Sequence, residues 1–237
     1  MKSFYPGNGY KIIRVDPGFA RVYLILTGNN AVLIDTGAKR RLPGIISSIN
    51  SLRKNLKLEY LVLTHTHFDH CQNLSNLKNI LDPYIIVGEP EANYIHNGLS
   101  PLPVGTNSWS KLIVRLGKSL NDDFFSYQPA QADITINNPY NLPGTDIDII
   151  PTPGHSPGSV SIIINKEFAL VGDSLFGISP FTIFPLFATD EEQLLKSWKI
   201  LIDTGCHTFI PAHGRIISID RLKKEFEKHS ARLRIKN

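Results

Sequence analysis

The sequence predicts an α/β fold in which helices cover packed β-sheets, and three observations lead to that prediction. Short runs rich in Val, Ile, Leu and Tyr recur along the chain, helical patterns lie between them, and no break in composition divides the 237 residues. Several runs are nearly continuous in apolar residues, which is typical of strands covered on both faces. We therefore expect one α/β domain over residues 1–237. The expected strands are 12–15, 22–26, 31–34, 60–63, 84–87, 147–150, 160–164 and 168–171.

Three helices can be located from apolar residues spaced three and four positions apart. The first begins near Pro43 and the last at about Asp220. The second is expected to start with a capping box formed by Thr189 and Glu192, and to stop before Gly205. The expected apolar faces are Ile45, Ile49 and Leu52 in the first, Leu194, Leu195, Trp198, Leu201 and Ile202 in the second, and Leu222, Phe226 and Leu233 in the last.

The strand pattern lapses in one stretch, where Gly, Pro, Asn and Ser become frequent. We expect an irregular and helical insertion there, at about 88–132, which could form part of a substrate wall. One amphipathic helix is expected within it. Its apolar face would consist of Trp109, Leu112, Ile113, Leu116 and Leu120.

The charge distribution and the cysteine content indicate which partners and which cellular compartment to expect. The formal net charge is +4, but Lys and Arg are spread along the chain, so nucleic acid is not an expected partner. The first residues lack the apolar core of a signal peptide, and the apolar stretch 175–188 is too short to span a bilayer. Two cysteines are too few for a disulfide framework, so both are expected to be free thiols in a reducing compartment. A cytoplasmic protein without a membrane segment is expected.

A histidine-rich segment follows the expected strand 60–63. Side chains at i and i+2 of a strand point to the same side, so His65 and His67 can face one point. If the chain then turns into a helix or loop, Asp69 and His70 reach a neighbouring point. Because histidine and carboxylate are preferred ligands of zinc and similar ions, the segment predicts a metal site rather than a group of surface histidines.

Three later segments each carry one more candidate ligand. His155, Asp173 and His213 all lie where a strand is expected to run into a loop, and each has a glycine as its neighbour in sequence. Glycine permits close approach of two backbones and unusual dihedral angles. A single ligand beside glycine therefore suits a crowded metal centre better than a packed core.

In order and spacing, these motifs resemble those of the metallo-β-lactamase-fold hydrolase superfamily, in particular its glyoxalase II and lactonase-like branch. The resemblance covers most of the chain and implies a four-layer αβ/βα sandwich with a binuclear metal centre at one edge between two sheets. Its matching parts are Asp35 within the segment 32–37, the cluster 65–70, His155, Asp173 and His213.

The resemblance also implies a role for each of these residues. The first metal would be held by His65, His67 and His155, the second by Asp69, His70 and His213, and Asp173 would bridge the two. Asp35 would orient the loop and its ligands through hydrogen bonds. The metals are expected to be two divalent ions, zinc above all, with iron or manganese as alternatives.

Such a centre predicts a dinuclear metal-dependent hydrolase in which a metal-bridging hydroxide attacks an ester-like bond. The substrate would be a small molecule, such as a thioester or a lactone. Asp69 is the candidate catalytic residue, because it lies beside the expected nucleophile and could orient it or pass a proton to the leaving group. Only about two dozen residues follow His213 and no Tyr follows Asp173, which argues against glutathione thioesters and acyl-homoserine lactones.

Three alternatives stay open at this stage. They are a mononuclear iron dioxygenase acting on persulfides, a compact phosphodiesterase or nuclease, and a non-catalytic metal-binding module. The apolar run 176–187 could be core, pocket wall or the contact of a homodimer. Cys71 is interpreted as a small buried residue rather than a ligand, and His96, His207 and His229 as surface or structural residues.

Overall fold

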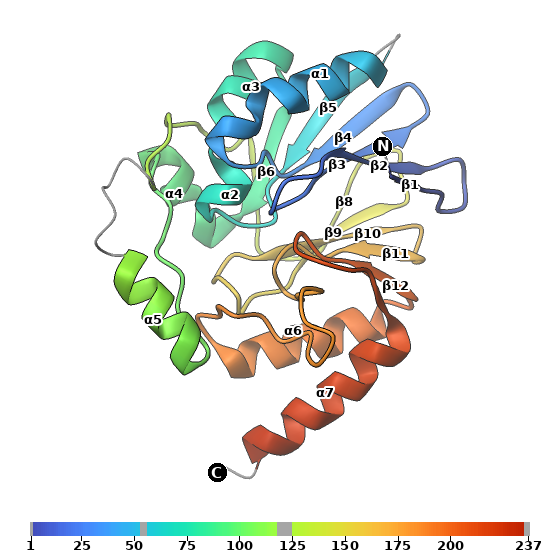
Figure 1. The fold of residues 1–237 in the computed structure, drawn as a ribbon. Helices are drawn as coiled ribbons and strands as arrows, with labels where there is room; N and C mark the ends of the chain where they lie inside the picture. Colours follow the sequence, from blue (N-terminus) through green and yellow to red (C-terminus); the bar gives the residue numbers. More distant parts are fainter. Residues whose placement is uncertain (1, 53–55, 118–124, 235–237) are drawn as a thin grey trace. The chain divides into compact units, whose positions relative to one another are not determined.

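The computed structural model describes residues 2–52, 56–117 and 125–234 (Figure 1). The chain divides into two compact units that exchange segments along the sequence. Unit 1 consists of Met1–Pro101 and Leu120–Asn137, and unit 2 of Leu102–Ser119 and Asn138–Asn237. Each unit has its own sheet and helices, and a single domain over residues 1–237 stays a prediction.

Unit 1 contains a seven-stranded sheet in which the strands follow chain order. Strands β1 to β4 pair antiparallel, and β4 to β7 pair parallel. The bounds are β1 (Ser3–Phe4), β2 (Lys11–Asp16), β3 (Val22–Thr27), β4 (Asn30–Ile34), β5 (Lys57–Val62), β6 (Tyr84–Gly88) and β7 (Ile134–Ile136). Because parallel strands share an edge at their carboxyl ends, the loops after β4, β5 and β6 begin at the same edge.

Helices cover one face of this sheet. In Figure 1, α1 and α3 lie on the same side of the strands. Their apolar residues join the strands in one buried cluster, to which α1 contributes Ile45 and Ile49, and α3 Leu74 and Leu77. The helical bounds of unit 1 are η1 (Lys39–Arg41), α1 (Leu42–Leu52), α2 (Phe68–Cys71), α3 (Leu74–Leu81), η2 (Glu89–Glu91) and α4 (Ala92–Asn97).

Unit 2 contains a six-stranded sheet in the order β13-β12-β11-β10-β9-β8. All neighbouring strands pair antiparallel except β11 and β12, which are parallel and are connected through the helix α6. The bounds are β8 (Tyr140–Asn141), β9 (Ile147–Pro151), β10 (Val160–Ile164), β11 (Phe168–Leu170), β12 (Thr208–Ile210) and β13 (Ile217–Ser218).

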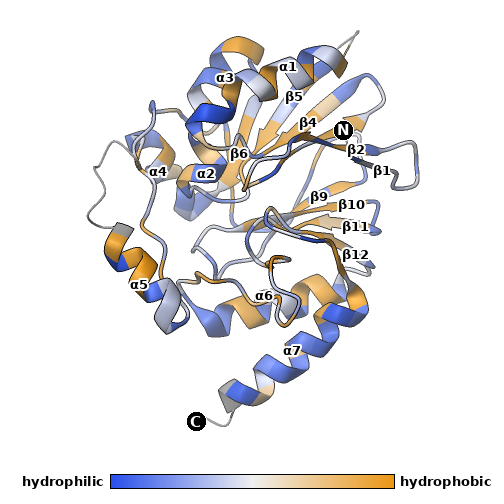
Figure 2. Ribbon diagram, viewed as in Figure 1, coloured by the Kyte–Doolittle hydropathy of each residue, from blue (hydrophilic) through white to orange (hydrophobic). Residues whose placement is uncertain are grey.

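The helices of unit 2 are α5 (Ser108–Gly117), α6 (Glu191–Asp203) and α7 (Ile219–Arg234). The expected apolar face of α6 is buried around Trp198, and Leu222 of α7 joins the same cluster. Figure 2 shows the apolar residues concentrated on the strands and on α6, whereas α7 is mostly hydrophilic. The side chain of Leu233 lies outside the described residues.

The expected capping box of α6 is wrong. The residue before the helix is Asp190, and its carboxylate accepts a hydrogen bond from Gln193 N at 2.9 Å. Thr189 instead donates its hydroxyl to the carbonyl oxygen of His155 at 3.0 Å. Thr and Asp both cap helices. Here Asp190 takes the capping position, because the hydroxyl of Thr189 is bonded to the loop that carries His155.

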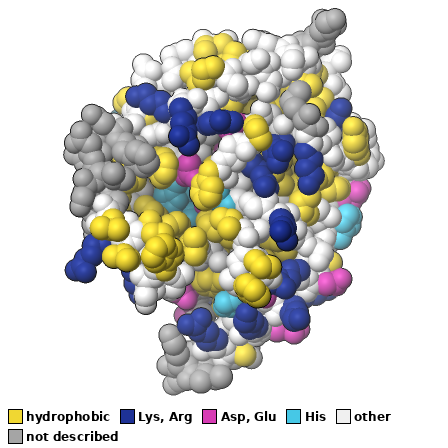
Figure 3. Space-filling view, viewed as in Figure 1, with side chains coloured by type: hydrophobic (Ala, Val, Ile, Leu, Met, Phe, Trp, Pro, Cys, Tyr) yellow, Lys and Arg dark blue, Asp and Glu magenta, His cyan; other side chains and the backbone are white. Residues whose placement is uncertain are grey.

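The stretch 88–132 contains more helix than its composition indicates. Besides α5, it includes the short helices η2 and α4, which follow β6 directly. The expected apolar face of α5 points to solvent, since Trp109 is 66% and Leu116 65% exposed, and Leu120 lies outside the described residues. In Figure 3, hydrophobic side chains gather over the part of the surface where α5 lies. No helix in the described part of the chain has the length and apolar character needed to cross a membrane.

Candidate metal-ligand clusters

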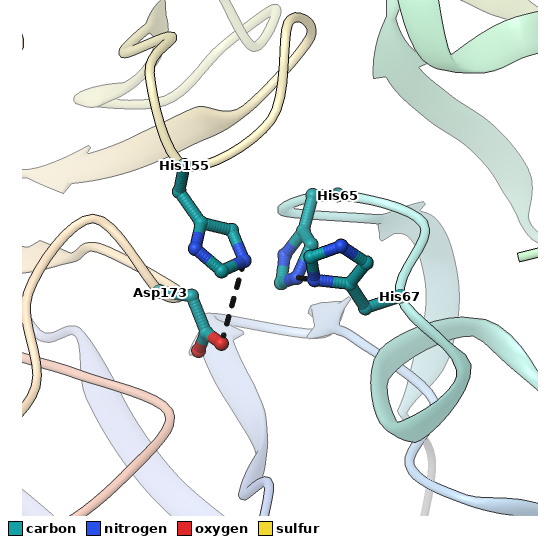
Figure 4. Close-up of side chains that lie close together, drawn as sticks. All are labelled: His65, His67, His155 and Asp173. Carbon is teal, nitrogen blue, oxygen red and sulfur yellow. Dashed lines mark hydrogen bonds and ion pairs between the residues drawn. The ribbon is translucent and has the colours of Figure 1, made fainter. Parts of the chain in front are cut away.

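In unit 1, the histidine-rich segment leaves the carboxyl end of β5 and enters the short helix α2. His65, His67 and His70 are all buried, and Asp69 is partly exposed. The expected proximity of His65 and His67 is observed, because His65 Nε2 lies 2.9 Å from His67 Nδ1 (Figure 4). In α2, Asp69 Oδ1 lies 3.9 Å from His70 Nε2. Four donors on one strand-to-helix turn therefore suit divalent ions.

Asp35 organises this segment from the neighbouring strand end. It follows β4 directly and has a left-handed backbone with φ of 62°, which Asp tolerates better than most residues. Its Oδ1 accepts from Thr64 N at 2.8 Å, and its Oδ2 lies 2.9 Å from Nδ1 of His70. A carboxylate at Nδ1 leaves Nε2 of His70 as the nitrogen that can hold a metal.

The residues after His70 connect α2 to the loop after β4. Asn73 Nδ2 donates to the carbonyl oxygens of Thr36, Gly37 and Ala38, at 2.8, 3.2 and 2.9 Å. Thr36 in turn donates its hydroxyl to the carbonyl oxygen of His70 at 2.8 Å. Side-chain hydrogen bonds thus connect the loop that carries Asp35 to the helix that carries His70.

A second support of the cluster was missed in the sequence. Glu91 is fully buried, and its carboxylate accepts a hydrogen bond from the hydroxyl of Thr66, between the two histidines. Ser100 donates to the carbonyl oxygen of Thr66 at 2.8 Å. The position of Glu91 after β6, the parallel neighbour of β5, indicates the correct edge of the sheet but does not reveal its partner.

The structure supports the interpretation of Cys71 as a buried residue. Its side chain belongs to the core cluster of unit 1, and its Sγ lies 3.3 Å from the carbonyl oxygen of Thr66, to which it donates. Burial raises the pKa of the Cys71 thiol to about 12. The thiol is therefore uncharged at neutral pH, whereas a cysteine that binds a metal does so as the thiolate.

This environment predicts that Cys71 does not react in the native protein. In a Cys206→Ser variant, we expect labelling by iodoacetamide at pH 8 to be at least about 100-fold slower in the native than in the urea-unfolded chain, since only the thiolate reacts. Mass spectrometry would measure the labelled fraction. Equal rates in the two states would contradict the prediction, and a thiol exposed by a chelator in the folded protein would identify Cys71 as a ligand.

In unit 2, His155 lies in the loop between β9 and β10 and is held by the backbone. Its Nδ1 lies 2.8 Å from the carbonyl oxygen of Phe187, an acceptor that requires a proton on Nδ1. The other ring nitrogen, Nε2, faces the carboxylate of Asp173 with a separation of 3.6 Å from Oδ2 (Figure 4). The lone pair of a neutral His155 ring therefore points to the Asp173 side.

Asp173 has a histidine at each of its two oxygens. Oδ2 faces His155, and Oδ1 lies 3.3 Å from Nε2 of His213. All three side chains are buried, and the ring of Phe176 lies 5.0 Å from that of His213, between ring centroids. A buried carboxylate with one ring nitrogen near each oxygen has the donor arrangement of a ligand that bridges two ions.

Glycines allow the ligand loops of unit 2 to approach other backbone segments. A Cβ atom on Gly214 would lie 2.1 Å from the carbonyl carbon of Gly177, and one on Gly177 would lie 2.0 Å from the carbonyl oxygen of Arg215. A Cβ on Gly154 would lie 2.3 Å from Leu194 N in α6. The close backbone approach expected beside these candidate ligands is thus observed at Gly154 and Gly214.

The seven ligand candidates and Asp35 therefore occur as two local groups. Unit 1 brings together Asp35, His65, His67, Asp69 and His70, and unit 2 brings together His155, Asp173 and His213. All seven candidates are His or Asp side chains that could hold a metal ion. Within each group the donors fit a divalent cation. Buried imidazole and carboxylate groups this close together have to share protons or bind a metal.

Several known proteins are similar to this chain in sequence. The chain is 32% identical over 171 residues to a probable metallo-hydrolase of Streptococcus pyogenes, an alignment that covers 70% of this chain and 66% of the relative. It is 28% identical to the lactamase-like protein nscB of Trichophyton rubrum, over 82% of this chain and 49% of that protein. The chain thus spans less than two thirds of the length of these two relatives.

Solved structures show the same fold. An archaeal metallo-beta-lactamase superfamily protein, ST1585 from Sulfolobus tokodaii, superposes with a TM-score of 0.65 at 23% identity, over 94% of this chain and 86% of that one. The metallo-β-lactamase fold predicted from the motifs is thereby confirmed. The family model described as the metallo-beta-lactamase superfamily matches residues 15–213, a span that contains every candidate ligand. This chain therefore belongs to the metallo-beta-lactamase superfamily.

Proposed function

We propose that this protein is a dinuclear metal-dependent hydrolase that acts on an ester-like bond of a small molecule. The observation that carries the proposal is the Asp173 carboxylate, which has His155 Nε2 3.6 Å from one oxygen and His213 Nε2 3.3 Å from the other. A carboxylate with a histidine nitrogen near each oxygen offers a donor pair to each of two ions. Membership of a superfamily that includes hydrolases, and the name of the streptococcal relative, add support.

The two local groups of donors are proposed to act together in one centre. In the proposed arrangement His65, His67 and His155 would hold one ion, Asp69, His70 and His213 would hold the other, and Asp173 would be a ligand shared by both. Zinc fits this donor set, and iron or manganese would also be accepted by it. When bound, the two ions would supply an activated water and polarise the carbonyl oxygen of the substrate.

The protein's own contribution is orientation and proton transfer. Asp35 fixes the tautomer of His70, and the carbonyl oxygen of Phe187 does the same for His155. Asp69 is the least buried of the candidate ligands in unit 1, with 17% of its side chain exposed. It is therefore the group best able to accept a proton from water and pass it to a leaving group.

The substrate class proposed is a thioester, lactone or related ester with an apolar acyl part. Within the run 176–187, the large apolar side chains of Ile178 and Phe181 are 46% and 82% accessible. Other members of the run 176–187, such as Phe176 and Ile183, are buried. A screen of thioesters, lactones, β-lactams and phosphodiesters with different acyl lengths would test the class, and equal turnover of short and long acyl chains would contradict it.

The proposed role of Asp69 predicts that Asp69→Asn lowers turnover by about 100- to 10,000-fold while the metal content stays unchanged. The amide keeps an oxygen that can bind a metal, but it cannot accept a proton at neutral pH. Elemental analysis of the purified wild type and variant would measure metals per chain, and initial rates on the best substrate of the screen would measure turnover.

The same measurements can contradict the proposal in two ways. Loss of metal together with activity in Asp69→Asn would contradict the prediction, because the loss of the ion alone would then account for the lost turnover. One iron per chain in the wild type, with oxygen uptake on persulfides, would replace the dinuclear hydrolase by the dioxygenase alternative. An Asp148→Asn variant, which changes a partly buried carboxylate on β9, controls for effects of the substitution itself.

A further inference from the structure

Unit 2 contains a cavity of about 350 Å³ that none of the proposed ligands lines. This volume lies within the range of about 300–1,000 Å³ that is typical of small-molecule sites. The cavity lies where the start of α5, the segment 182–186 and the helices α6 and α7 meet. Its lining residues are Thr106, Asn107, Thr182, Phe184, Pro185, Leu186, Glu191, Leu195, Lys228, His229 and Arg232.

One side of the cavity is apolar and partly aromatic. Phe184 stacks on the imidazole of His229, with ring centroids 4.5 Å apart and an angle of 26° between the planes. Leu195 of α6 and Leu186 complete this wall. Burial lowers the pKa of His229, which favours the neutral ring, and the stacked ring presents an aromatic face. This wall suits a hydrocarbon chain or ring.

The other side carries a small excess of positive charge. Lys228 and Arg232 lie one helical turn apart on α7, and Glu191 is the single acid of the lining. The buried Glu225 also contacts this side, since its Oε2 lies 3.6 Å from the ammonium group of Lys228 and 3.4 Å from Nε2 of His229. Its Oε1 lies 3.2 Å from the guanidinium of Arg221, whose charge balances that of Glu225. Two cations and one acid leave one positive charge, which fits a ligand with a single negative charge.

From this combination we propose that the cavity binds a small amphipathic monocarboxylate, with its hydrocarbon part against Phe184 and Leu195 and its carboxylate at Lys228 and Arg232. Paired cations one turn apart recognise a carboxylate by charge-assisted hydrogen bonds. His229, expected from the sequence to be a surface or structural residue, would serve here as part of the wall. This site goes beyond the proposed hydrolytic function and does not depend on it.

The neighbouring Trp198 supplies an optical signal for occupancy. Its ring centroid lies 5.7 Å from that of Phe184 and 5.9 Å from that of His229, two residues of the cavity wall. The chain has two tryptophans, and the other, Trp109, is 66% exposed on α5. In a Trp109→Phe variant, the emission therefore comes from Trp198 alone.

The experiment titrates the Trp109→Phe protein with octanoate and, separately, with the neutral isostere octanamide. We expect a saturable change in the emission of Trp198, with a dissociation constant at least about tenfold lower for octanoate, because only the carboxylate gains the charge-assisted bonds. The further change Lys228→Gln with Arg232→Gln should weaken octanoate by about tenfold or more and leave octanamide within about twofold.

A matched control removes the same charge elsewhere on the same helix. Lys223 and Lys224 are exposed and do not line the cavity, so Lys223→Gln with Lys224→Gln should leave the octanoate affinity within about twofold. Equal affinity for octanoate and octanamide, an equal loss in both double variants, or no saturable change in emission would each overturn the proposal. None of these readouts involves metal or turnover, so failure here is distinct from failure of the proposed hydrolase.

Discussion

Replacing Asp35 by alanine is expected to lower the affinity for divalent metal by about 10- to 100-fold, the effect typical of losing a residue that orients metal ligands. Asp35 contacts the backbone and hydroxyl of Thr64, as well as the Nδ1 atom of His70. Without it, Nδ1 of His70 loses its carboxylate acceptor, and the Thr64 hydroxyl beside it is more distant, at 3.5 Å. Competition between the protein and a chromogenic chelator for Zn²⁺ or Co²⁺ would measure the change.

Alanine at this position also strains the backbone, because Asp35 has φ of 62°. Asp82→Ala is the control for that strain, since Asp82 has φ of 49° at the end of α3 and its side chain is 88% exposed. Its cost should be about 1 kcal/mol of unfolding free energy or less, with unchanged metal affinity. If Asp82→Ala lowered metal affinity as much as Asp35→Ala, the effect would belong to stability rather than to ligand orientation.

Replacing Gly214 by alanine should destabilise the protein by more than about 4 kcal/mol, the size of effect reserved for severe structural conflict. The new Cβ would lie 2.1 Å from the carbonyl carbon of Gly177, in a backbone with φ of 90°. Neither backbone can move freely, because Gly177 N donates to the carbonyl oxygen of His213 at 2.8 Å. Urea unfolding followed by circular dichroism would measure the loss.

The loss in Gly214→Ala has two causes, the steric clash of the Cβ atom and the strain of a left-handed backbone, and Gly205→Ala separates them. Gly205 has φ of 83°, but a Cβ there would meet no atom within 4 Å. It should therefore cost only the strain of a left-handed backbone, about 1 to 2 kcal/mol. A Gly214→Ala protein no less stable than Gly205→Ala would show that the crossing of the two loops is looser than the structure indicates.

Much of the candidate site could be predicted because metal ligands obey local rules. The proximity of His65 and His67 follows from the two-residue repeat of an extended chain, and the glycine beside His213 follows from the crowding of two loops. Glu91 and Asn73 escaped because their roles depend on partners 25 and 35 to 37 positions away. A single buried polar residue has no periodicity that would reveal such partners.

The strand predictions likewise fail where the sequence has no recognisable periodicity. The eight expected runs all correspond to strands, with ends that differ by up to three residues. The strands missed have two or three residues each, as in β8, β12 and β13, too few for an alternating pattern to be recognised. Thr189 shows that the choice between adjacent caps is made by tertiary contacts. A small-molecule substrate, a homodimer and a cytoplasmic location stay predictions.

The bond from His155 to the carbonyl oxygen of Phe187 has a consequence for how such a scaffold can diverge. A main-chain oxygen is the same atom in every residue, so the side chain at position 187 can change without removing the acceptor. Its neighbours Pro185 and Leu186 are likewise held through their carbonyl oxygens, by the hydroxyl of Thr106. Substitutions in the segment 185–187 could therefore change its side chains, and with them the ligand that it selects. The orientation of the His155 ring would stay the same.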